Sequence, residues 1–396
     1  MNNYKVYLSM RIVKTILNGF IDSFFVLYFL DVSHSNILPL GIYKLIAISA
    51  IYAVMFFSRN FCTSKKRINL TRTGIILNLL YFLAIVILRE NITKYMYIVG
   101  LLYGLGEGFY FSVYNNIESD GIKNEERAKY LGTYRALSAI ISIIYPLVFG
   151  GIIYETGFIK SLLILMVMVV ALIVLSFMIK DHNVPKKAKT DLKAYANIAK
   201  KNEVIKKSYI VQFFDGLTYS EGAFSYIVTI YIIKVFSNSV SLGIFTSIFS
   251  LITALLGILF AKCIKPKHYA SIIRVSMAFT VISLCLMIYK CNMITIILFN
   301  LFKTFSRELM DLINLKNKTN TSNLSIIQKE YKVEYWFGVE TALFIGRLIS
   351  NSLFILMAFT GAGVMIYIFA IFLILFARAL INLQKTVERN KENVEI

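Results

Sequence analysis

The sequence predicts an all-α membrane protein with twelve transmembrane helices in two six-helix repeats. Apolar residues make up 58% of its 396 positions and charged residues only 16%, against about 45–50% and about 25% in ordinary soluble domains. The apolar residues form windows of about 20 residues, the length that a helix needs to cross a bilayer core. The basic residues lie mostly between these windows. These observations exclude an ordinary soluble enzyme.

Twelve apolar windows follow one another along the chain. The first six are residues 8–31, 38–58, 73–89, 95–117, 131–153 and 160–180, and the last six are 209–234, 240–261, 269–290, 292–313, 335–358 and 361–382. Backbone polar groups in lipid must be satisfied within their own segment, so each window is expected to be a helix. The first window contains Asp22 and is too long for a cleavable signal peptide.

The basic residues predict the orientation in the membrane. Of 42 Lys and Arg, 29 lie on one side, in the N-terminal segment (Lys5, Arg11 and Lys14), the loops 59–72, 118–130, 181–208, 262–268 and 314–334, and the C-terminal tail. The opposite loops hold 5. The positive-inside rule then predicts a multi-pass protein of the cell membrane with both termini in the cytoplasm. Charge spread over membrane-adjacent loops favours lipid contacts and argues against a nucleic-acid partner.

The sequence offers no cofactor or metal motif. The four Cys and three His are scattered without metal-ligand spacing. No ATP-binding loop, HExxH motif or nucleophile elbow is present. We therefore expect no cofactor, no metal and no enzymatic activity, and any uphill movement of a solute would use an ion gradient.

The windows divide six and six. We expect a first bundle over residues 1–180, a basic cytoplasmic linker over 181–208, a second bundle over 209–384 and a cytoplasmic tail over 385–396. Residues 191–207 of the linker could form an amphipathic helix on the inner leaflet or a solvated connection, and both interpretations are open. The two halves share short sequence similarities, since Asn18-Gly19 matches Asp215-Gly216, and Gly132 matches Gly338. Such matches favour two parallel repeats.

Short motifs make the chain resemble the major facilitator superfamily of secondary transporters over essentially its whole length. They are the glycine-rich Gly104–Gly108, the turn Glu126–Gly132, and Pro146 with Gly150-Gly151, which is similar to a helix-5 pattern of family exporters. The loop from Ser58 to Arg72 lacks the Asp and Gly that the family usually has there, so membership of the standard drug:proton subfamily does not follow. The resemblance implies a 6+6 helix fold that works by alternating access.

Charged residues inside the windows are unevenly placed. They concentrate in windows one, four, seven and ten, which line the central cavity in the family that the chain resembles. Because a charge at mid-bilayer is costly, such residues usually face a protein interior or a watery cavity. Glu107, Asp22 and Glu221 are the candidates for proton or cation coupling, with Glu221 preferred to Asp215 because it lies deeper in its window. A structural ion pair of Glu107 with Arg135 is the alternative.

A second set is predicted to bind the substrate or gate its passage. It comprises Asp215, Arg135, Lys303, Arg307, Asp311, Glu340 and Arg347. Lys303, Arg307 and Asp311 recur every four residues and share one helix face, where they could contact an anion, gate, or simply be solvated. Glu340 and Arg347 also share a face and are expected to form a structural or gating pair.

These features predict a secondary active transporter of a small molecule, functional as a monomer and coupled to protons or another ion. The acids outnumber the bases in the windows, which favours a cationic or amphiphilic solute, and the helix-5 pattern favours efflux of a drug-like compound. Proton-coupled uptake of a metabolite is the alternative. A receptor or assembly partner built on the same fold, without transport activity, is a third possibility.

Overall fold

A computed structural model describes residues 3–58, 67–122, 124–179, 191–265, 268–322, 324, 327, 331–360 and 362–392. This part of the chain is helical and contains no strand, and each predicted window falls mainly on helix. Nine stretches of helix in it are long and apolar enough to cross a membrane, and one of them, Arg67–Tyr114, covers the predicted window 73–89 and most of the window 95–117. The all-α membrane fold is confirmed, and twelve spans are consistent with it.

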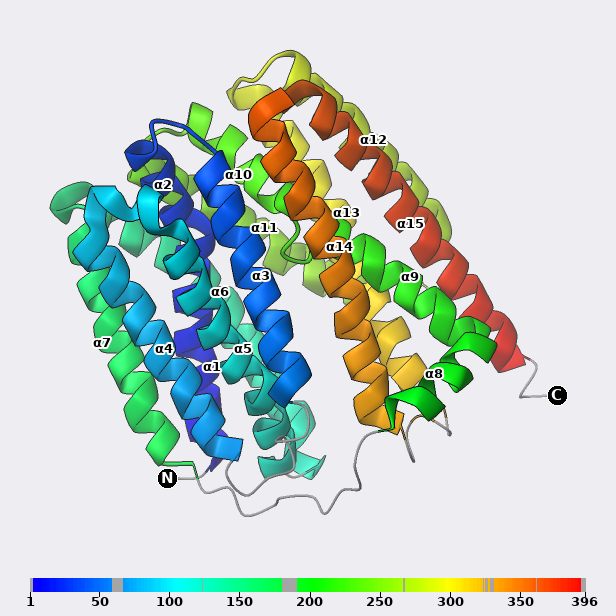
Figure 1. The fold of residues 1–396 in the computed structure, drawn as a ribbon. Helices are drawn as coiled ribbons and strands as arrows, with labels where there is room; N and C mark the ends of the chain where they lie inside the picture. The colour runs from blue at the N-terminus through cyan, green and yellow to red at the C-terminus, as the bar shows by residue number, and fades with distance from the viewer. Residues whose placement is uncertain are drawn as a thin grey trace. The chain divides into compact units, whose positions relative to one another are not determined.

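The chain forms two compact units (Figure 1). The first contains Met1–Lys189 and Phe236–Ser250, and the second contains Thr190–Val235 and Leu251–Ile396. The helix α11 (Ser239–Cys263) therefore contributes its first half to one unit and its second half to the other. Residues 181–190 of the predicted linker lie outside the described residues.

The first unit is built from apolar helices with one buried side. Its elements are α1 (Asn3–Phe20), the π-helical turn η1 (Ile21–Phe25), α2 (Val26–Val32), α3 (Leu38–Ser58), α4 (Arg67–Leu88), the 3-10 turn η3 (Arg89–Tyr95), α5 (Met96–Gly121), α6 (Asn124–Thr156) and α7 (Phe158–Phe177). On α7, Leu162, Leu165, Val169 and Leu172 are buried, whereas Val167 and Val174 are exposed. A 3–4 residue spacing of buried positions on an otherwise apolar helix is typical of one face against protein and one against lipid.

Glycines let α5 approach its neighbours closely. A Cβ at Gly100 would lie 2.6 Å from the carbonyl oxygen of Tyr43 on α3, and one at Gly104 would lie 2.4 Å from that of Ala47. On the side facing α4, a Cβ at Gly106 would lie 2.4 Å from Asn78 Oδ1. Small residues at four-residue spacing are a usual basis of helix packing in membranes. The glycine-rich motif thus sets the position of the helix that carries Glu107.

The second unit contains a discontinuous helix. Its elements are α8 (Leu192–Lys201), α9 (Glu203–Leu217), α10 (Ala223–Val235), the end of α11, α12 (Tyr269–Tyr289), α13 (Met293–Ser322), α14 (Lys332–Thr360) and α15 (Ala362–Glu392). The window 209–234 was expected to be one helix, and this expectation is wrong, since residues 218–222 separate α9 from α10. Glu221 in this break has φ 58°, a left-handed conformation that no helix continues through.

Equivalent helix pairs are in contact in both units. In the first unit α1 contacts α6 and α7, while α4 contacts α5 and α7. In the second, α9 contacts α14 and α15, while α12 contacts α13 and α15. If α1 with α2 and α9 with α10 each count as one span, and α8 is not counted, these contacts join the first span to the fifth and sixth, and the third span to the fourth and sixth, in both halves. The predicted two-repeat organisation is therefore confirmed by packing as well as by sequence echoes.

The linker helix α8 packs onto the second unit. This stretch of the predicted linker is helical. Its buried Tyr195 and Ala199 join a core cluster with Ile205 of α9 and Tyr335 and Val339 of α14. Tyr195 and Tyr209 share a 2.5 Å hydrogen bond between their hydroxyl groups, and burial is the main reason that the pKa of Tyr195 rises to about 12. This hydrogen bond between the two phenols links α8 to α9.

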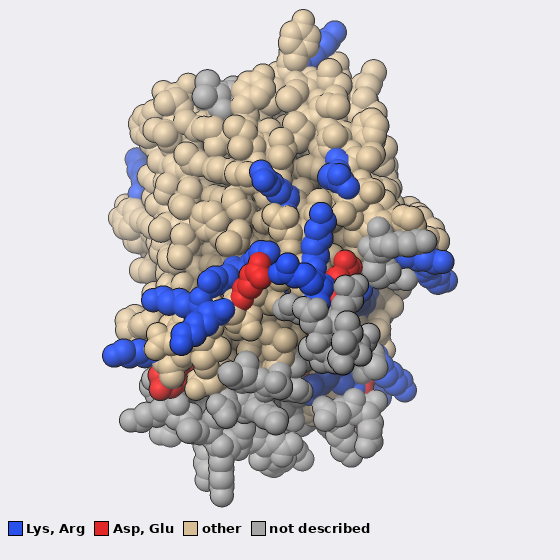
Figure 2. Space-filling model, turned by 90° about the vertical axis from the view of Figure 1, so that its right-hand side faces the viewer, with Lys and Arg blue, Asp and Glu red and all other residues tan. Residues whose placement is uncertain are grey.

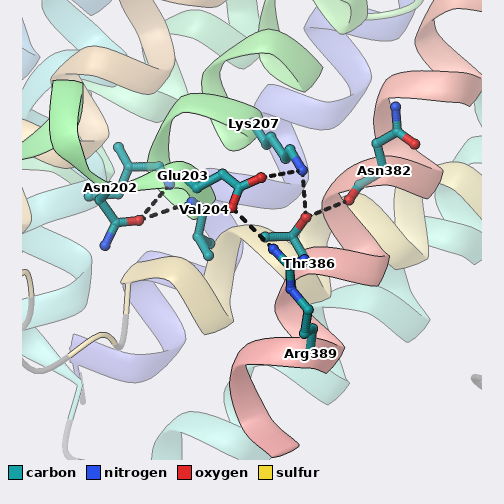
Figure 3. Close-up of polar contacts among 8 residues, drawn as sticks. Asn202, Glu203, Val204, Lys207, Asn382, Thr386 and Arg389 are labelled. Atoms are coloured by element: carbon teal, nitrogen blue, oxygen red, sulfur yellow. Dashed lines mark hydrogen bonds and ion pairs between the residues drawn. The ribbon is translucent and has the colours of Figure 1, made fainter. Parts of the chain in front are cut away.

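The beginning of α9 and the end of α15 are joined by exposed polar contacts (Figure 3). Glu203 accepts from Lys207 at 2.7 Å and from Arg389 at 3.3 Å, and Lys207 also donates to Thr386 Oγ1 at 2.8 Å. The hydrogen bond from Lys207 is the main reason that the pKa of Glu203 is lowered from its ordinary value. Figure 2 shows Lys and Arg side chains gathered across the middle of the face that it draws, with a surface that carries few charged side chains above them.

Candidate functional site

A buried ion pair joins α1 to α5 in the first unit. Lys14 Nζ donates to Glu107 Oε1, and the two side chains are 6% and 4% exposed. The ammonium also lies 5.1 Å from the ring centroid of Tyr110. Pairing of Glu107 with Arg135 was the alternative derived from sequence, and it is wrong. Arg135 lies on an exposed face of α6, whereas position 14 faces the inside of the bundle.

A second buried carboxylate lies three helical turns further along α5. Glu118 accepts from Arg11 through both oxygens, at 2.7 Å from Nε and 2.6 Å from Nη2. Tyr130 of α6 donates its hydroxyl hydrogen to the same carboxylate. The guanidinium lies 4.9 Å from the ring centroid of Tyr134. Glu118 thus joins α5 to α1 through a bidentate Arg contact, which is among the stronger hydrogen-bonded pairs in proteins, and to α6 through Tyr130.

A cavity of about 100 Å³ lies beside these two pairs. It is lined by Arg11, Lys14, Thr15 and Asn18 of α1, by Tyr110, Phe111 and Tyr114 of α5, and by Tyr134 of α6. Both cations line it, but neither of their carboxylate partners does. The cavity therefore presents positive charge, hydroxyl and amide groups, and aromatic faces.

The carboxylate of Asp22 lies elsewhere. Asp22 is exposed in the π-helical turn η1, which interrupts the helix between α1 and α2. Such turns are often found at functional sites. The structure does not bring Asp22 into the group of residues that line the cavity.

The break between α9 and α10 is held by α14 in the second unit. Arg347 Nε donates to the carbonyl oxygen of Ser220 at 2.8 Å, and Nη2 donates to its hydroxyl at 3.1 Å. Ser350 Oγ accepts from the amide of Ala223, the first residue of α10, at 2.8 Å. Backbone groups freed by a helix break inside a membrane must be satisfied by neighbouring protein. Arg347 and Ser350 do this here.

Glu340 and Arg347 lie 3.8 Å apart as an ion pair on α14, and the Glu340 side chain is 42% exposed. Glu221 is exposed in the break itself, and its charge acts on Arg347. Arg347 thus lies between two carboxylates and the unwound backbone. Arg347 is therefore the cation that holds the break, a role that the sequence did not show.

Asp215 is buried at the end of α9. Its Oδ2 accepts from Asn314 Nδ2 at 3.1 Å, and Asn314 Oδ1 accepts from Gln212 at 2.8 Å. Position along the window had favoured Glu221 over Asp215 as the interior acid. In the structure Asp215 is the enclosed one, with a neutral amide network linking α9 to α13.

The charged stripe of α13 forms a looser group. Arg307 Nε lies 3.4 Å from Asp311 Oδ2, and both side chains are about two-fifths exposed. Arg307 also lies 5.5 Å from the ring centroid of Tyr219 in the helix break. Lys303 lies 5.8 Å from the ring centroid of Phe299 and has no carboxylate within 4 Å among the described residues. Its amine therefore has no carboxylate partner in the charged stripe.

No group of three or more His, Cys, Asp or Glu that could hold a metal ion occurs within the described ranges. The site residues that the sequence missed are Arg11, Lys14 and Glu118 in the first unit and Asn314 in the second. Arg11 and Lys14 had been counted with the cytoplasmic charges of the N-terminal segment. A signal was present, because Arg11 and Lys14 lie one helical turn apart inside the first apolar window, residues 8–31.

Comparisons with known proteins agree with this fold. A family model described as Major Facilitator Superfamily matches residues 7–305. A curated relative, the uncharacterized protein YqgE of Bacillus subtilis (strain 168), is 20% identical over 336 residues, which are 84% of this chain and 77% of that protein.

Solved transporter structures are similar over nearly the whole chain. A variant of the nucleoside transporter NupG matches with a TM-score of 0.71 at 13% identity, over 97% of this chain and 100% of that one. A D-xylose-proton symporter matches with a TM-score of 0.69 at 12% identity, over 95% and 96%. An inward-facing bacterial homologue of the iron transporter ferroportin matches with 0.66 at 12%, over 96% and 97%. At such identities the likeness concerns the fold.

Proposed function

The chain belongs to the major facilitator superfamily, and on this premise we propose that it moves a small organic solute across the cell membrane by proton-coupled alternating access. It is a multi-pass membrane transporter and not an enzyme. Its two units supply the two halves that such a mechanism needs. We further propose that it works as a monomer and that both termini lie in the cytoplasm. The distribution of basic residues supports this orientation.

The observation that carries proton coupling is the buried Lys14–Glu107 pair beside a polar cavity. A buried ion pair is often no more stabilising than apolar residues of the same size, so its presence favours a role other than stability. Protonation of Glu107 would remove its charge and release Lys14. An event at one carboxylate would thereby change the charge that the cavity offers to a solute.

The direction of transport follows from how proton and solute binding are linked. Efflux is supported by the pattern of Pro146 with Gly150-Gly151 on α6. In the structure these residues accept contacts from α11, since Ser239 donates to Gly150 O and a Cβ at Gly243 would lie 2.3 Å from Pro146 O. The motif therefore has a packing role that does not depend on direction, and uptake is an equal candidate.

The test is solute-driven proton movement in liposomes that contain the purified protein and an internal pH indicator. With a panel of nucleosides, sugars, amino acids and organic acids, we expect at least one solute to move protons, and Glu107→Gln to abolish this coupling. Glu155→Gln, at an exposed position near the end of α6, is the matched control. Undiminished proton movement in Glu107→Gln, Asp22→Asn and Glu221→Gln alike would refute these proton sites. Solute binding without movement of solute or protons would instead indicate a receptor.

A further inference from the structure

We infer that the cavity between α1 and α5 binds the carboxylate head group of a small hydroxy- or amino-carboxylate, which replaces Glu107 at Lys14. This deepens the proposed function and rests on it. The carboxylates counted along the sequence had favoured a cationic solute. The structure places Glu107 and Glu118 behind their partner cations, so the surface that a solute meets is positive.

Lys14 is the anchor of this site. An ammonium has three hydrogens to donate, and in the described part of the protein Lys14 gives one of them to Glu107. Its charge is already balanced by one carboxylate. The exchange that keeps this balance is another monoanion, which favours a carboxylate over a doubly charged phosphate.

Asn18 supplies a second recognition point, one helical turn from Lys14. Its Oδ1 atom is buried and has no hydrogen-bond partner among the described residues, although the residue lines the cavity. Buried polar atoms are nearly always hydrogen-bonded. A solute hydroxyl or amino group beside the carboxylate would satisfy this acceptor.

The size and walls of the cavity define the head group further. Ligand pockets for whole drug-sized molecules usually have about 300–1,000 Å³, whereas this cavity has about 100 Å³. It therefore accommodates a group of few atoms. Tyr110 and Tyr114 stack with ring centroids 4.8 Å apart and provide one wall, against which the carbon atoms of the solute can pack.

Exchange at Lys14 links the solute to a proton. If the solute carboxylate takes Lys14, Glu107 is left buried without a counter-charge, which is costly unless it becomes protonated. Solute and proton therefore bind together, and by reciprocity each strengthens the binding of the other. The solute and the proton are therefore expected to cross the membrane together, in the same direction. The ionisable groups next to this pair are Tyr110 on α5, on which Glu107 and Glu118 both act, and Arg11 on α1, which pairs with Glu118. Tyr130 and Tyr134 of α6 contact Glu118 and Arg11. The helices α3 and α4, which also pack against α5, carry the buried cations Lys44 and Arg67.

The experiment measures binding of lactate, serine and malate, their neutral amides, choline and glycerol phosphate to the purified protein, with proton uptake recorded in weakly buffered solution. We expect a carboxylate to bind with uptake of about one proton and its amide to bind at least tenfold more weakly. Lys14→Gln should lose at least tenfold in affinity, and Asn18→Leu should lose affinity for lactate but not for propionate, which has no donor beside its carboxylate. Lys193→Gln, an exposed change on α8, should have no effect.

Lys14→Gln combined with Glu107→Gln removes both buried charges, so it keeps the test valid if the single variant does not fold. We expect this double variant to bind no carboxylate. Equal binding of acid and amide, tighter binding of glycerol phosphate or choline, or no carboxylate binding at millimolar concentration would overturn the inference. Proton-coupled transport of a neutral or cationic solute would overturn it while leaving the proposed function intact. Carboxylate binding that needs Lys14 but gives no transport in liposomes would support the inference and refute the proposed function.

Discussion

Lys14 and Glu107 are 93 positions apart in the chain, yet they form an ion pair that is almost completely enclosed between α1 and α5. Removing one partner of such a pair leaves an uncompensated buried charge and usually costs about 3–5 kcal/mol, whereas replacing both by apolar residues can be neutral. Single and double replacements of this pair can therefore show whether it contributes to thermal stability, to proton-coupled transport or to both.

We expect Lys14→Met and Glu107→Met each to lower the thermal stability of the purified protein, and the double variant to recover most of the loss. The double variant should not recover proton-coupled transport, because it lacks a carboxylate to protonate. Unfolding curves in detergent and liposome assays on the same samples test this. If the two losses simply add in the double variant, the residues do not act as a pair.

The break between α9 and α10 depends on Arg347. A lysine there could not donate to both oxygens of Ser220 in the same geometry, since only the guanidinium has a rigid fork of donors. Arg347→Lys is expected to increase hydrogen exchange at residues 218–222. Ser220→Ala keeps the contact between Arg347 and the backbone, so it should lower the free energy of unfolding by at most about 3 kcal/mol, as for a single hydrogen bond to a charged group.

Equal exchange at residues 218–222 in wild type and Arg347→Lys would show that the break is held by other contacts. Arg274→Lys, at an exposed position on α12, is the control for the same chemical change without a partner in the break.

The contact between α9 and α14 has no space for side chains at its centre. A Cβ at Gly346 would lie 2.2 Å from the carbonyl oxygen of Phe213, and one at Gly216 would lie 2.3 Å from that of Leu343. Gly346→Ala should separate the helices and cost about 1–3 kcal/mol, as overpacking does. Gly151→Ala has no atom within 4 Å of the new Cβ and should be neutral or slightly stabilising. Equal melting temperatures for the two variants would contradict this packing.

The contacts of Glu203 predict a pH effect at the end of α15. Because the pKa of Glu203 is lowered in the folded protein from its ordinary 4.5, its contribution to stability is present above that value and is lost as the pH falls through the lower, folded-state pKa. Hydrogen exchange in the last turns of α15, corrected for its intrinsic pH dependence, should therefore increase in acid. Glu203→Gln should show the faster exchange already at neutral pH, with little further change on acidification.

The glycine motifs show where reasoning from the sequence succeeds. Gly19 and Gly216 were matched between the two halves, and they do pack against the equivalent helices α6 and α14. The charged positions were harder to interpret. Asp215 and Glu221 could be assigned to one window but not to an enclosed and an exposed environment, because the break at residues 218–222 results from contacts with α14.

The amino-acid sequence by itself determined the all-helical membrane fold and the helices that carry charge, because each depends on composition and periodicity within about 20 residues. It also determined the two repeats, through motifs that recur in the same order in both halves. The choice of partners was decided only by the tertiary structure. Lys14 rather than Arg135 meets Glu107 because the rotation of α1 and α6 about their axes is set by packing against several other helices at once. No local pattern records that rotation, and it determines which charges a solute meets.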